Sequence, residues 1–303
     1  MKTALDPDLY YTLPLRLGKF VGMHAKMSRR QVWRAWKEDR IELLVAGSSH
    51  RVQPGIQDYV FPGEDQIFLD GKPLDVVRAS GYYVLNKPVD VITTTSDPQG
   101  RRCLTPWLEQ LPEGVFPVGR LDRQTTGALF LTDHGELMHQ LLHPEFHVEK
   151  MYELTVSTRR GGVDEGLKIL EQGVDIQDGK GVAKAVSMTV LEQTVEDKER
   201  GQIRVHLVLN EGRNRQVRKM CKFSNLYLDH LHRVTFGPLG VTGMADGEVR
   251  ELTSDEVNEV WQAVGGVHQP FLRGLELLRA SVARYQEEND PNPRLEQWIS
   301  RFE

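Results

Sequence analysis

The sequence predicts an α+β protein with a small N-terminal domain, a larger domain with a mixed, mainly antiparallel sheet, and a helical C-terminal extension. Length and composition are the first reason, because 303 residues with 39% hydrophobic content favour two cores over one. The order of segments is the second: strand-like and helix-like runs do not alternate strictly, which argues against a doubly wound parallel sheet. The third is the recurrence of Pro-Gly and Asp-Gly turn signals between short strand-like runs.

Composition shifts and turn signals set the expected boundaries. After a loose leader of residues 1–14, the small domain occupies residues 15–73, and QIFLDGKPL reads as a hairpin that closes it. A linker at residues 74–80 leads to the sheet domain at residues 81–254. The acidic remainder, residues 255–303, has helical periodicity and is long enough for two or three helices.

One helix of the small domain has a clear start signal. Ser28 is its predicted N-cap, because Gln31 three residues later completes a capping box. Trp33 and Trp36 then recur at helical spacing, which favours places in the core over a base-stacking role. Near the other end of the chain, Ser254 is the expected N-cap of DEVNEVWQAV.

The sheet domain contains most of the strand-like segments. Strands are expected at 82–88, 127–133, 150–156, 187–195 and 201–210, and helices at 136–143, 163–173 and 214–224. The segment VDIQDGKGVAKA superficially resembles a phosphate loop, but its glycine spacing is wrong and Gly181 stands where Ser or Thr is required. We therefore predict a hairpin with its turn at Asp178-Gly179.

Charge is distributed unevenly along the chain. The net charge of -5 alone argues against a polyanionic partner. However, residues 15–40 hold eight Lys and Arg against two acids, and residues 204–233 hold seven against two. A solvated helix face accounts for either stretch taken alone, whereas two such stretches in an acidic chain indicate a polarised surface suited to nucleic acid.

Several classes of protein and site are not indicated. No run approaches the roughly 20 apolar residues of a membrane helix, and MKTALDPDLYY lacks an apolar signal-peptide core, so we expect a cytoplasmic protein. Cys103 and Cys221 form no CxxC pair. His139 and His143 have helical spacing, but Pro144 is expected to end that helix and no HExxH glutamate is present. Structural or RNA-contact roles are thus favoured over metal binding for these histidines.

The segment GRLDRQTTGALFLTD contains the first candidate catalytic residue. Asp122 lies between Arg120 and Arg123, just before a predicted strand. Nearby cations favour the ionised form of a carboxylate, which then serves as a nucleophile or general base. An ordinary turn or cap role is the alternative interpretation of this motif alone. A hydrolytic glycosidase would need a second carboxylate close to Asp122.

Two further segments carry candidate binding residues. In LNEGRNRQVRKMC, a turn at Glu211-Gly212 precedes a basic helix whose N-terminal dipole favours phosphate. The segment forms either a phosphate clamp, with one arginine free to reach a buried carboxylate, or an exposed basic helix. Tyr152, inside KMYELTV, is either a core residue with a solvated hydroxyl or a platform for base stacking.

In combination these motifs resemble a known family. GRLDRQTTG, KMYEL, NEGRNRQVRKM and LHRVTFGPL follow one another as in the bacterial ribosomal-RNA pseudouridine synthases of the RsuA type. RLGKFVGMHAKMSRRQVWRAWKEDRI resembles the RNA-binding helix pair of their S4-like domain, and YYVLNKPVDVITT and DGEVRELTSDEV resemble the opening and ending of their catalytic domain. The resemblance covers residues 15–258. It departs at Asp133-His134-Gly135, where the family often has Asn-Asp-Gly, and at Val45-Ala46-Gly47, where an Asn-Gly turn is usual.

The resemblance implies an isomerase that converts a uridine of RNA to pseudouridine. Asp122 would attack the ribose at C1′ or promote a glycal route, Tyr152 would stack on the base, and Arg218 would pair with Asp122. Leu231 would form the floor of the base pocket, and Arg120 would help to flip the nucleotide. The remaining RNA contacts that we expect are Arg213, Arg215, Lys219, Arg29, Arg30 and Arg34.

The chemistry of an isomerisation limits what else the protein needs. The reaction has no redox step and no net hydrolysis, so we expect no cofactor and no metal. The expected partner is RNA, either ribosomal RNA or a ribosomal assembly intermediate, bound by a monomer. Extruding a base costs a few kcal/mol, which phosphate contacts from the two basic stretches can offset. The rival functions are a non-catalytic S4-type RNA-binding or ribosome assembly protein and a nucleoside or glycoside hydrolase.

Overall fold

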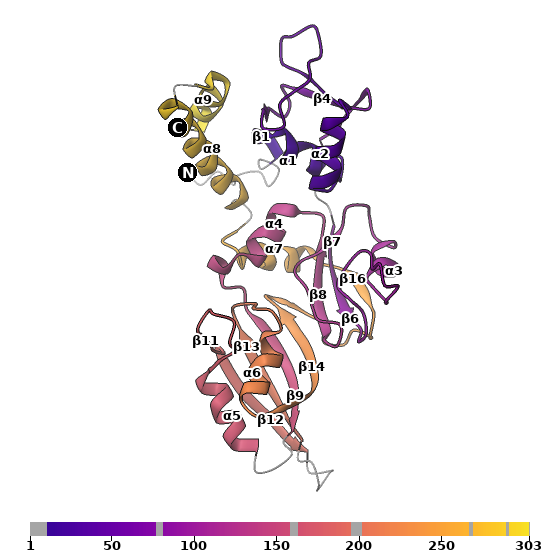
Figure 1. The fold of residues 1–303 in the computed structure, drawn as a ribbon, viewed down its shortest axis with the longest axis vertical. Coiled ribbons are helices and arrows are strands. Elements are labelled where there is room, and N and C mark those ends of the chain that lie inside the picture. The colour runs from indigo at the N-terminus through magenta and orange to yellow at the C-terminus, as the bar shows by residue number, and fades with distance from the viewer. Residues whose placement is uncertain are drawn as a thin grey trace. The chain divides into compact units, whose positions relative to one another are not determined.

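The computed structural model describes residues 11–76, 81–157, 163–194, 202–266, 269–288 and 291–302. The chain divides into two compact units, of which the first comprises residues 1–79 and 265–303 and the second residues 80–264. Figure 1 shows the elements of both units. The sequence suggested a separate extension from residue 255, whereas the contacts group the last helices with the N-terminal residues. Within the described ranges, no helix has the length and apolar character needed to cross a membrane.

The first unit combines short strands with helices from both ends of the chain. Its elements are β1 (Leu15–Arg16), α1 (Leu17–His24), α2 (Arg29–Lys37), β2 (Ile41–Leu44), β3 (Tyr59–Val60), β4 (Gln66–Leu69), β5 (Lys72–Pro73), α8 (Gln269–Glu287), α9 (Pro293–Ile299) and the 3-10 turn η3 (Ser300–Phe302). Strand β1 pairs with β3, and β2, β4 and β5 form a three-stranded antiparallel sheet. The hairpin predicted in QIFLDGKPL is confirmed, because β4 and β5 pair across it.

Helix α2 begins where the sequence predicted. Ser28 Oγ accepts a hydrogen bond from the Gln31 backbone N–H, and the Gln31 side chain accepts one from the Ser28 N–H. Trp36 is half-buried and donates from Nε1 to the Pro54 carbonyl at 2.8 Å. The prediction for Trp33 is wrong, because 52% of that residue is exposed. Val32 already faces the core, and the next residue of a helix points about 100° away from it.

Residues from the two ends of the chain share the core of the first unit. Tyr11 and Leu13 are buried in it, so the expectation of a loose leader is wrong for these two residues. Gly274 of α8 lies against Leu13, and a Cβ at this position would come within 2.5 Å of Leu13 Cδ1. Trp298 and Ile299 of α9 are buried in the same core. The C-terminal helices are therefore an integral part of this unit.

Polar contacts join the same segments. Arg294 of α9 lies 2.8 Å from Asp65 Oδ1, and the Asp65 side chain is fully buried. The Tyr59 hydroxyl donates to Ser281 Oγ of α8 at 3.1 Å. A buried carboxylate loses its hydration and needs such a partner, so the Arg294 contact links the C-terminal helices to the N-terminal fold.

The second unit is built on one large sheet. Its strands are β6 (Tyr82–Lys87), β7 (Phe116–Pro117), β8 (Thr126–Thr132), β9 (Lys150–Ser157), β12 (Ser187–Thr194), β13 (Gln202–Leu209), β14 (Tyr227–Phe236), β15 (Leu239–Gly240) and β16 (Val249–Glu251), with the separate hairpin β10 (Val174–Asp175) and β11 (Val182–Ala183). The order is β12-β13-β9-β14-β8-β6-β16, with β15 paired to β14 and β7 to β8. Only the β8–β14 pairing is parallel among those described, which confirms the predicted mixed, mainly antiparallel sheet.

Most helices of this unit lie at the predicted positions, but the short helix Thr105–Leu108 was not predicted. The helices are α3 (Thr105–Leu108), α4 (Gly135–Leu142), α5 (Val163–Gln172), α6 (Gln216–Phe223) and α7 (Ser254–Gln262), together with the 3-10 turn η2 (Pro144–Phe146). The N-cap of α7 is Thr253, which accepts from the Glu256 N–H in a capping box, so the prediction of Ser254 is wrong by one residue. The sequence analysis did not predict β14, because its many polar residues hide the alternation of apolar and polar side chains that is typical of a strand.

One apolar cluster attaches α5 and α6 to the sheet (Figure 1). Leu167 of α5 and Met220 of α6 are buried in it together with Leu154 of β9, Val205 of β13 and Leu231 of β14. Alternate residues of these strands point into this cluster, as expected for a sheet with one covered face. The packing fixes α6 against the strands that carry Tyr152 and Leu231.

A glycine allows the central strands to meet. Gly127 of β8 pairs with Arg233 of β14 in the parallel register. Its φ is +104°, and a Cβ would lie only 2.2 Å from the Arg233 carbonyl oxygen, so no other residue fits without moving the backbone. This contact joins the strand that follows Asp122 to the strand that contains Leu231.

Candidate active site

A pocket in the second unit brings together residues from four parts of the chain. Its lining residues are Arg120, Leu121, Asp122, Thr125, Tyr152, Leu209, Glu211, Gly212, Arg213, Arg215, Gln216, Val217, Arg218 and Leu231. Seven of the candidate residues named from the sequence are among them: Arg120, Asp122, Tyr152, Arg213, Arg215, Arg218 and Leu231. Motifs that are separate in sequence therefore meet at one site.

The turn that carries Asp122 is held by short hydrogen bonds. Thr93 Oγ1 donates to the Leu121 carbonyl at 2.8 Å and accepts from the Leu121 N–H at 3.1 Å. The Thr125 N–H donates to the Asp122 carbonyl at 3.0 Å, which closes a turn. Strand β8 starts at the next residue, so the carboxylate projects from a turn that is fixed on both sides.

Two guanidinium groups face the Asp122 carboxylate. Arg218 Nε lies 3.3 Å from Asp122 Oδ2, and Arg215 Nη1 lies 3.7 Å from the same oxygen. The first contact is an ion pair without hydrogen-bond alignment, because Arg218 Nε has no aligned acceptor among the described residues. Arg218 Nη2 also donates to the Gln124 carbonyl at 2.8 Å and to Thr125 Oγ1 at 3.1 Å. These bonds hold Arg218 on the same turn that positions the carboxylate.

An aromatic ring and a buried leucine both line the pocket. Tyr152 of β9 is half-buried, and Leu231 of β14 is 4% exposed. Because both lie on central strands, their side chains are fixed by the sheet rather than by a mobile loop. An apolar lining beside an ion pair suits a planar base that is partly polar at its edges.

Arg233 is a functional candidate that the sequence analysis did not select. The residue is 3% exposed, donates from Nε to the Ala128 carbonyl at 2.7 Å and hydrogen-bonds to the Tyr152 side chain. Burial lowers the pKa of this guanidinium, and Tyr152 opposes that effect. No carboxylate pairs with it in the described part of the chain. The motif LHRVTFGPL contained this arginine, but sequence alone does not tell that it is buried and pairs in register with Tyr152.

Lys87 is a second buried cation of this unit. Its side chain is completely buried at the end of β6, and Nζ donates to the carbonyls of Pro88 and Val91 at 2.8 Å each. Burial lowers the pKa of Lys87 to about 8, against attraction from Asp246 and Asp122. The contacts brace the segment that leads to Thr93 and so to the Asp122 turn. The tripeptide Asn-Lys-Pro was the available signal in the sequence.

The remaining candidates fall into two groups. Arg120 and Arg215 are exposed at the pocket, and Lys219 is half-buried on α6 outside the lining. Arg29, Arg30 and Arg34 are all exposed on α2 of the first unit. No group of three or more histidine, cysteine or acidic side chains is arranged to hold a metal in the ranges that the structure describes.

Comparison with known proteins agrees with this geometry. The family model described as RNA pseudouridylate synthase matches residues 81–223, which include Asp122, Tyr152 and Arg218. Among solved structures, one titled "Crystal structure of pseudouridylate synthase" has a TM-score of 0.52 at 24% identity, covering 81% of this chain and 99% of that chain. At that identity the structural likeness supports the fold alone.

The similarity to sequence relatives covers nearly the whole length of those relatives. The ribosomal large subunit pseudouridine synthase B of Bacillus subtilis is 32% identical over 248 residues, covering 81% of this chain and 95% of that protein. An uncharacterized RNA pseudouridine synthase of Aquifex aeolicus is 30% identical, covering 86% of this chain and 99% of that protein. The ribosomal small subunit pseudouridine synthase A of Yersinia pestis is 28% identical, covering 81% and 98%. With a pocket that unites the motifs of that enzyme class, the chain belongs to the RNA pseudouridine synthase family and is an isomerase.

Proposed function

We propose that this protein converts a specific uridine of ribosomal RNA to pseudouridine, with Asp122 as the nucleophile. The observation that carries the proposal is the pairing of Asp122 with Arg218 at 3.3 Å in a pocket that Tyr152 and Leu231 also line. The choice of ribosomal RNA rests on the names of the Bacillus subtilis and Yersinia pestis relatives. Acting on ribosomal RNA also fits a cytoplasmic protein, and we propose that it works as a monomer.

The reaction rearranges one bond and conserves every atom. In the direct route, an Asp122 oxygen bonds to ribose C1′ while the C1′–N1 bond breaks and its electron pair stays on uracil N1. The uracil then turns so that its C5 attacks C1′ and the carboxylate leaves. Loss of the C5 proton and protonation of N1 complete pseudouridine. In the glycal route, Asp122 instead removes the C2′ proton while the C1′–N1 bond breaks, which leaves a C1′–C2′ double bond. The proton returns to C2′ as uracil C5 bonds to C1′, and the same product forms.

The pocket residues suit these steps. Arg218 and Arg215 direct positive charge at the Asp122 carboxylate, the group that we assign to nucleophilic attack. Tyr152 offers a ring on which the detached uracil can stack while it turns, and Leu231 excludes water beneath it. Arg120 is exposed at the pocket, and we assign it to the position that the flipped uridine leaves. No step uses a cofactor or a metal.

Docking of the RNA is assigned to both basic stretches. Arg29, Arg30 and Arg34 lie exposed on one helix, where each can neutralise a phosphate and release a counterion. The sequence of this helix pair resembles an S4-like RNA-binding domain, and we propose that role for the first unit. Near the pocket, Arg215 and Lys219 are available for the strand that contains the target.

Replacing the nucleophile tests the proposal directly. Asp122→Asn keeps the size of the side chain but removes its negative charge, so we expect at least a roughly 10⁴-fold loss of pseudouridine formation. The matched control is Asp255→Asn, which removes an exposed charge on α7 and should leave the rate unchanged. Both proteins are incubated with unmodified ribosomal RNA transcripts, and pseudouridine and bound RNA are quantified. Normal product formation by Asp122→Asn would refute the assignment of the nucleophile.

The rival hydrolase function depends on a second carboxylate. Glu211 does line the pocket, but Arg213 Nε lies 3.0 Å from its Oε2, and Gln216 Nε2 donates to its Oε1 at 2.7 Å. Both oxygens of this carboxylate are engaged by neighbouring side chains, so neither is directed at a substrate. The same assay separates the two functions, because a hydrolase releases free uracil and an isomerase does not.

A further inference from the structure

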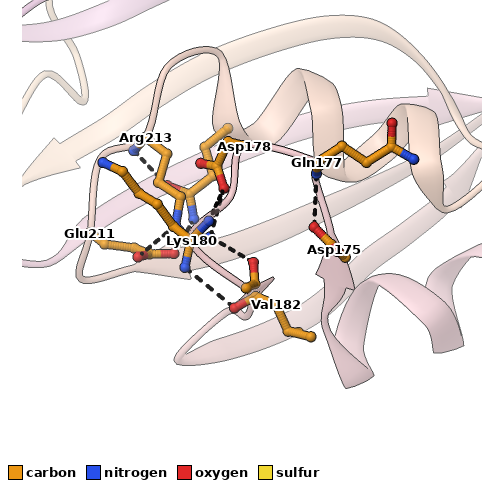
Figure 2. A network of polar contacts seen from close by, with 9 residues as sticks. Asp175, Gln177, Asp178, Lys180, Val182, Glu211 and Arg213 are labelled. Atoms are coloured by element: carbon orange, nitrogen blue, oxygen red, sulfur yellow. Dashed lines mark hydrogen bonds and ion pairs between the residues drawn. The ribbon is translucent and has the colours of Figure 1, made fainter.

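The loop after β13 contains an arginine that points into the protein rather than toward solvent. Arg213 Nε contacts Glu211 Oε2 at 3.0 Å, and Nη1 contacts Asp178 Oδ1 at 3.4 Å. The guanidinium also donates to the carbonyls of Gly181 at 2.8 Å and Val182 at 3.3 Å. Its side chain is only 11% exposed. Figure 2 shows these contacts. With its donors directed at internal acceptors, Arg213 does not fit the phosphate contact that the sequence suggested.

Apart from Glu211, the side-chain partners of Arg213 belong to the β10–β11 hairpin, residues 174–183. Each of its strands has two residues, and a hairpin of this size is not stable alone. Ile176 and Ala183 anchor it in the apolar cluster beneath. The turn at Asp178-Gly179 is formed as predicted, with the Lys180 N–H donating to Asp178 Oδ1 at 3.0 Å. Arg213 is thus the polar link between this turn and the rim of the pocket.

The link matters because Arg213 and its neighbours Glu211 and Gly212 themselves line the pocket. The position of the hairpin is therefore fixed relative to Asp122 through one short loop. Gln216 strengthens that loop, because its Oε1 accepts from the Arg213 N–H at 2.9 Å while its Nε2 donates to Glu211. A guanidinium fork can hold several acceptors in one plane, which a lysine cannot do.

The hairpin presents a surface suited to a nucleic-acid backbone. Gly179, Lys180 and Gly181 are exposed at its turn, followed by the exposed Val182 and Lys184. A Cβ at Gly179 or Gly181 would meet nothing within 4 Å, so the backbone there is open to close approach. Asp178 attracts Lys180 as well as Arg213, but no ion pair of the Lys180 ammonium is found within the described ranges of the chain. Its charge can therefore meet a phosphate.

We propose that the hairpin Val174–Ala183 is the contact surface for the RNA strand beside the flipped uridine, with Lys180 on a phosphate and Arg213 as the residue that positions the hairpin. This inference rests on the proposed function for the identity of the ligand. It separates two cations that the chain places close together. Lys180 neutralises a phosphate of the RNA, whereas Arg213 neutralises carboxylates of the protein itself.

The experiment compares single substitutions at these two cations. Binding of an unmodified ribosomal RNA transcript is measured between 50 and 200 mM KCl, with amide hydrogen exchange across residues 174–183 measured in parallel. Lys180→Ala should reduce the salt slope by about one and leave exchange unchanged. Arg213→Gln should keep the slope, because an internally paired cation releases no counterion, and should raise exchange in the hairpin roughly tenfold or more. Lys168→Ala, an exposed lysine on α5, is the control and should change neither.

Turnover gives the second measurement. Arg213→Gln should raise KM about tenfold with kcat within about twofold, because the Asp122 turn and Arg218 are held by contacts that do not involve Arg213. Arg213→Lys should have a KM close to that of Arg213→Gln, since lysine keeps the positive charge but lacks the planar guanidinium group that holds several acceptors. A wild-type salt slope for Lys180→Ala would overturn the RNA contact. A slope reduced by one in Arg213→Gln, with unchanged hairpin exchange, would overturn the positioning role. Failure of the proposed function is distinguishable, because it appears as absence of product with the wild-type protein.

Discussion

Two arginine-rich stretches of this protein look alike in sequence and differ in structure. On α2, Arg29 and Arg30 are exposed, and no ion pair or hydrogen bond of their side chains is found within the described part of the chain. Around α6, by contrast, Arg218 pairs with Asp122, and Arg213 pairs with Glu211 and Asp178. The first group has its charge available for a partner, and much of the charge in the second is used by the protein itself.

The difference teaches that the number of arginines does not measure affinity for nucleic acid. A cation contributes to RNA binding when its phosphate contact displaces counterions, which a guanidinium already paired with a carboxylate does only weakly. Within the first unit, Arg40 illustrates the same contrast. Although it belongs to the basic stretch by sequence, Asp70 holds it in a bidentate pair at 2.6 and 2.8 Å. Exposure and partners, rather than local charge, distinguish the two uses.

The largest effect is expected where an arginine faces the nucleophile. Arg218→Met should lower the rate of pseudouridine formation roughly 10²- to 10³-fold, the range found for removing a group that stabilises charge in an active site. RNA affinity should change by less than about threefold, since this charge is committed to Asp122. Single-turnover assays with excess enzyme measure the rate without the influence of binding. A rate within threefold of wild type would mean that Arg218 is not needed for catalysis, and the contrast between the two arginine-rich stretches would fail.

Substitutions on α2 should have a smaller effect, and it should fall on RNA binding rather than on the reaction rate. The double substitution Arg29→Ala with Arg30→Ala should reduce the slope of log affinity against log salt by about two. Between 50 and 200 mM salt this amounts to roughly tenfold less salt-induced loss of affinity. The single-turnover rate at saturating RNA should be unaffected. Arg40→Ala serves as the matched control and should leave the slope unchanged, because Asp70 already neutralises that residue. An unchanged slope in the double variant would exclude α2 from RNA docking.

The smallest effect concerns an arginine that we assign to stability alone. Arg250 donates to both oxygens of Glu256 at 2.6 and 2.8 Å, and chiefly this hydrogen bonding lowers the pKa of Glu256 to about 2. A depressed carboxyl pKa stabilises the folded state above the unfolded value of 4.5, and that contribution is lost as pH falls from 4.5 toward 2.

The measurement is urea unfolding of wild type and Glu256→Gln at several pH values. After allowance for solvent screening, we expect the wild type to be more stable by about 1 kcal/mol at pH 7. The difference should shrink through the same pH window. A gap that persists at pH 2 would assign the effect to the capping box with Thr253 rather than to the charge pair.

Local structure follows from the sequence with few errors. The capping box of Ser28 and Gln31 and the turn at Asp178-Gly179 were both predicted, because the interactions that form them span only a few residues. The Thr253 cap was missed by one residue, since neighbouring Thr and Ser are equivalent on sequence grounds. Strand β14 was missed altogether. Its stability comes from pairing with β9 and β8, which no local pattern records.

The candidate site was predictable as a set of residues but not as an arrangement. Asp122, Tyr152 and Arg218 were selected from separate motifs, and the fold brings all three to one pocket. The burial of Arg233 opposite Tyr152 on the neighbouring strand was not foreseen. Arg213 was expected to contact RNA, and its pairing with Asp178 and Glu211 was not foreseen. Whether an arginine faces phosphate or carboxylate depends on residues far away in the chain.

The sequence by itself determined the elements, the turns and the residues capable of the chemistry, because backbone preference and side-chain type act over short distances. Only the tertiary structure decided which cations are paired, where Trp33 points, and that α8 and α9 complete the N-terminal core. The physical reason is that burial and charge pairing are properties of packed surfaces, and each surface is made by segments that the chain does not place side by side.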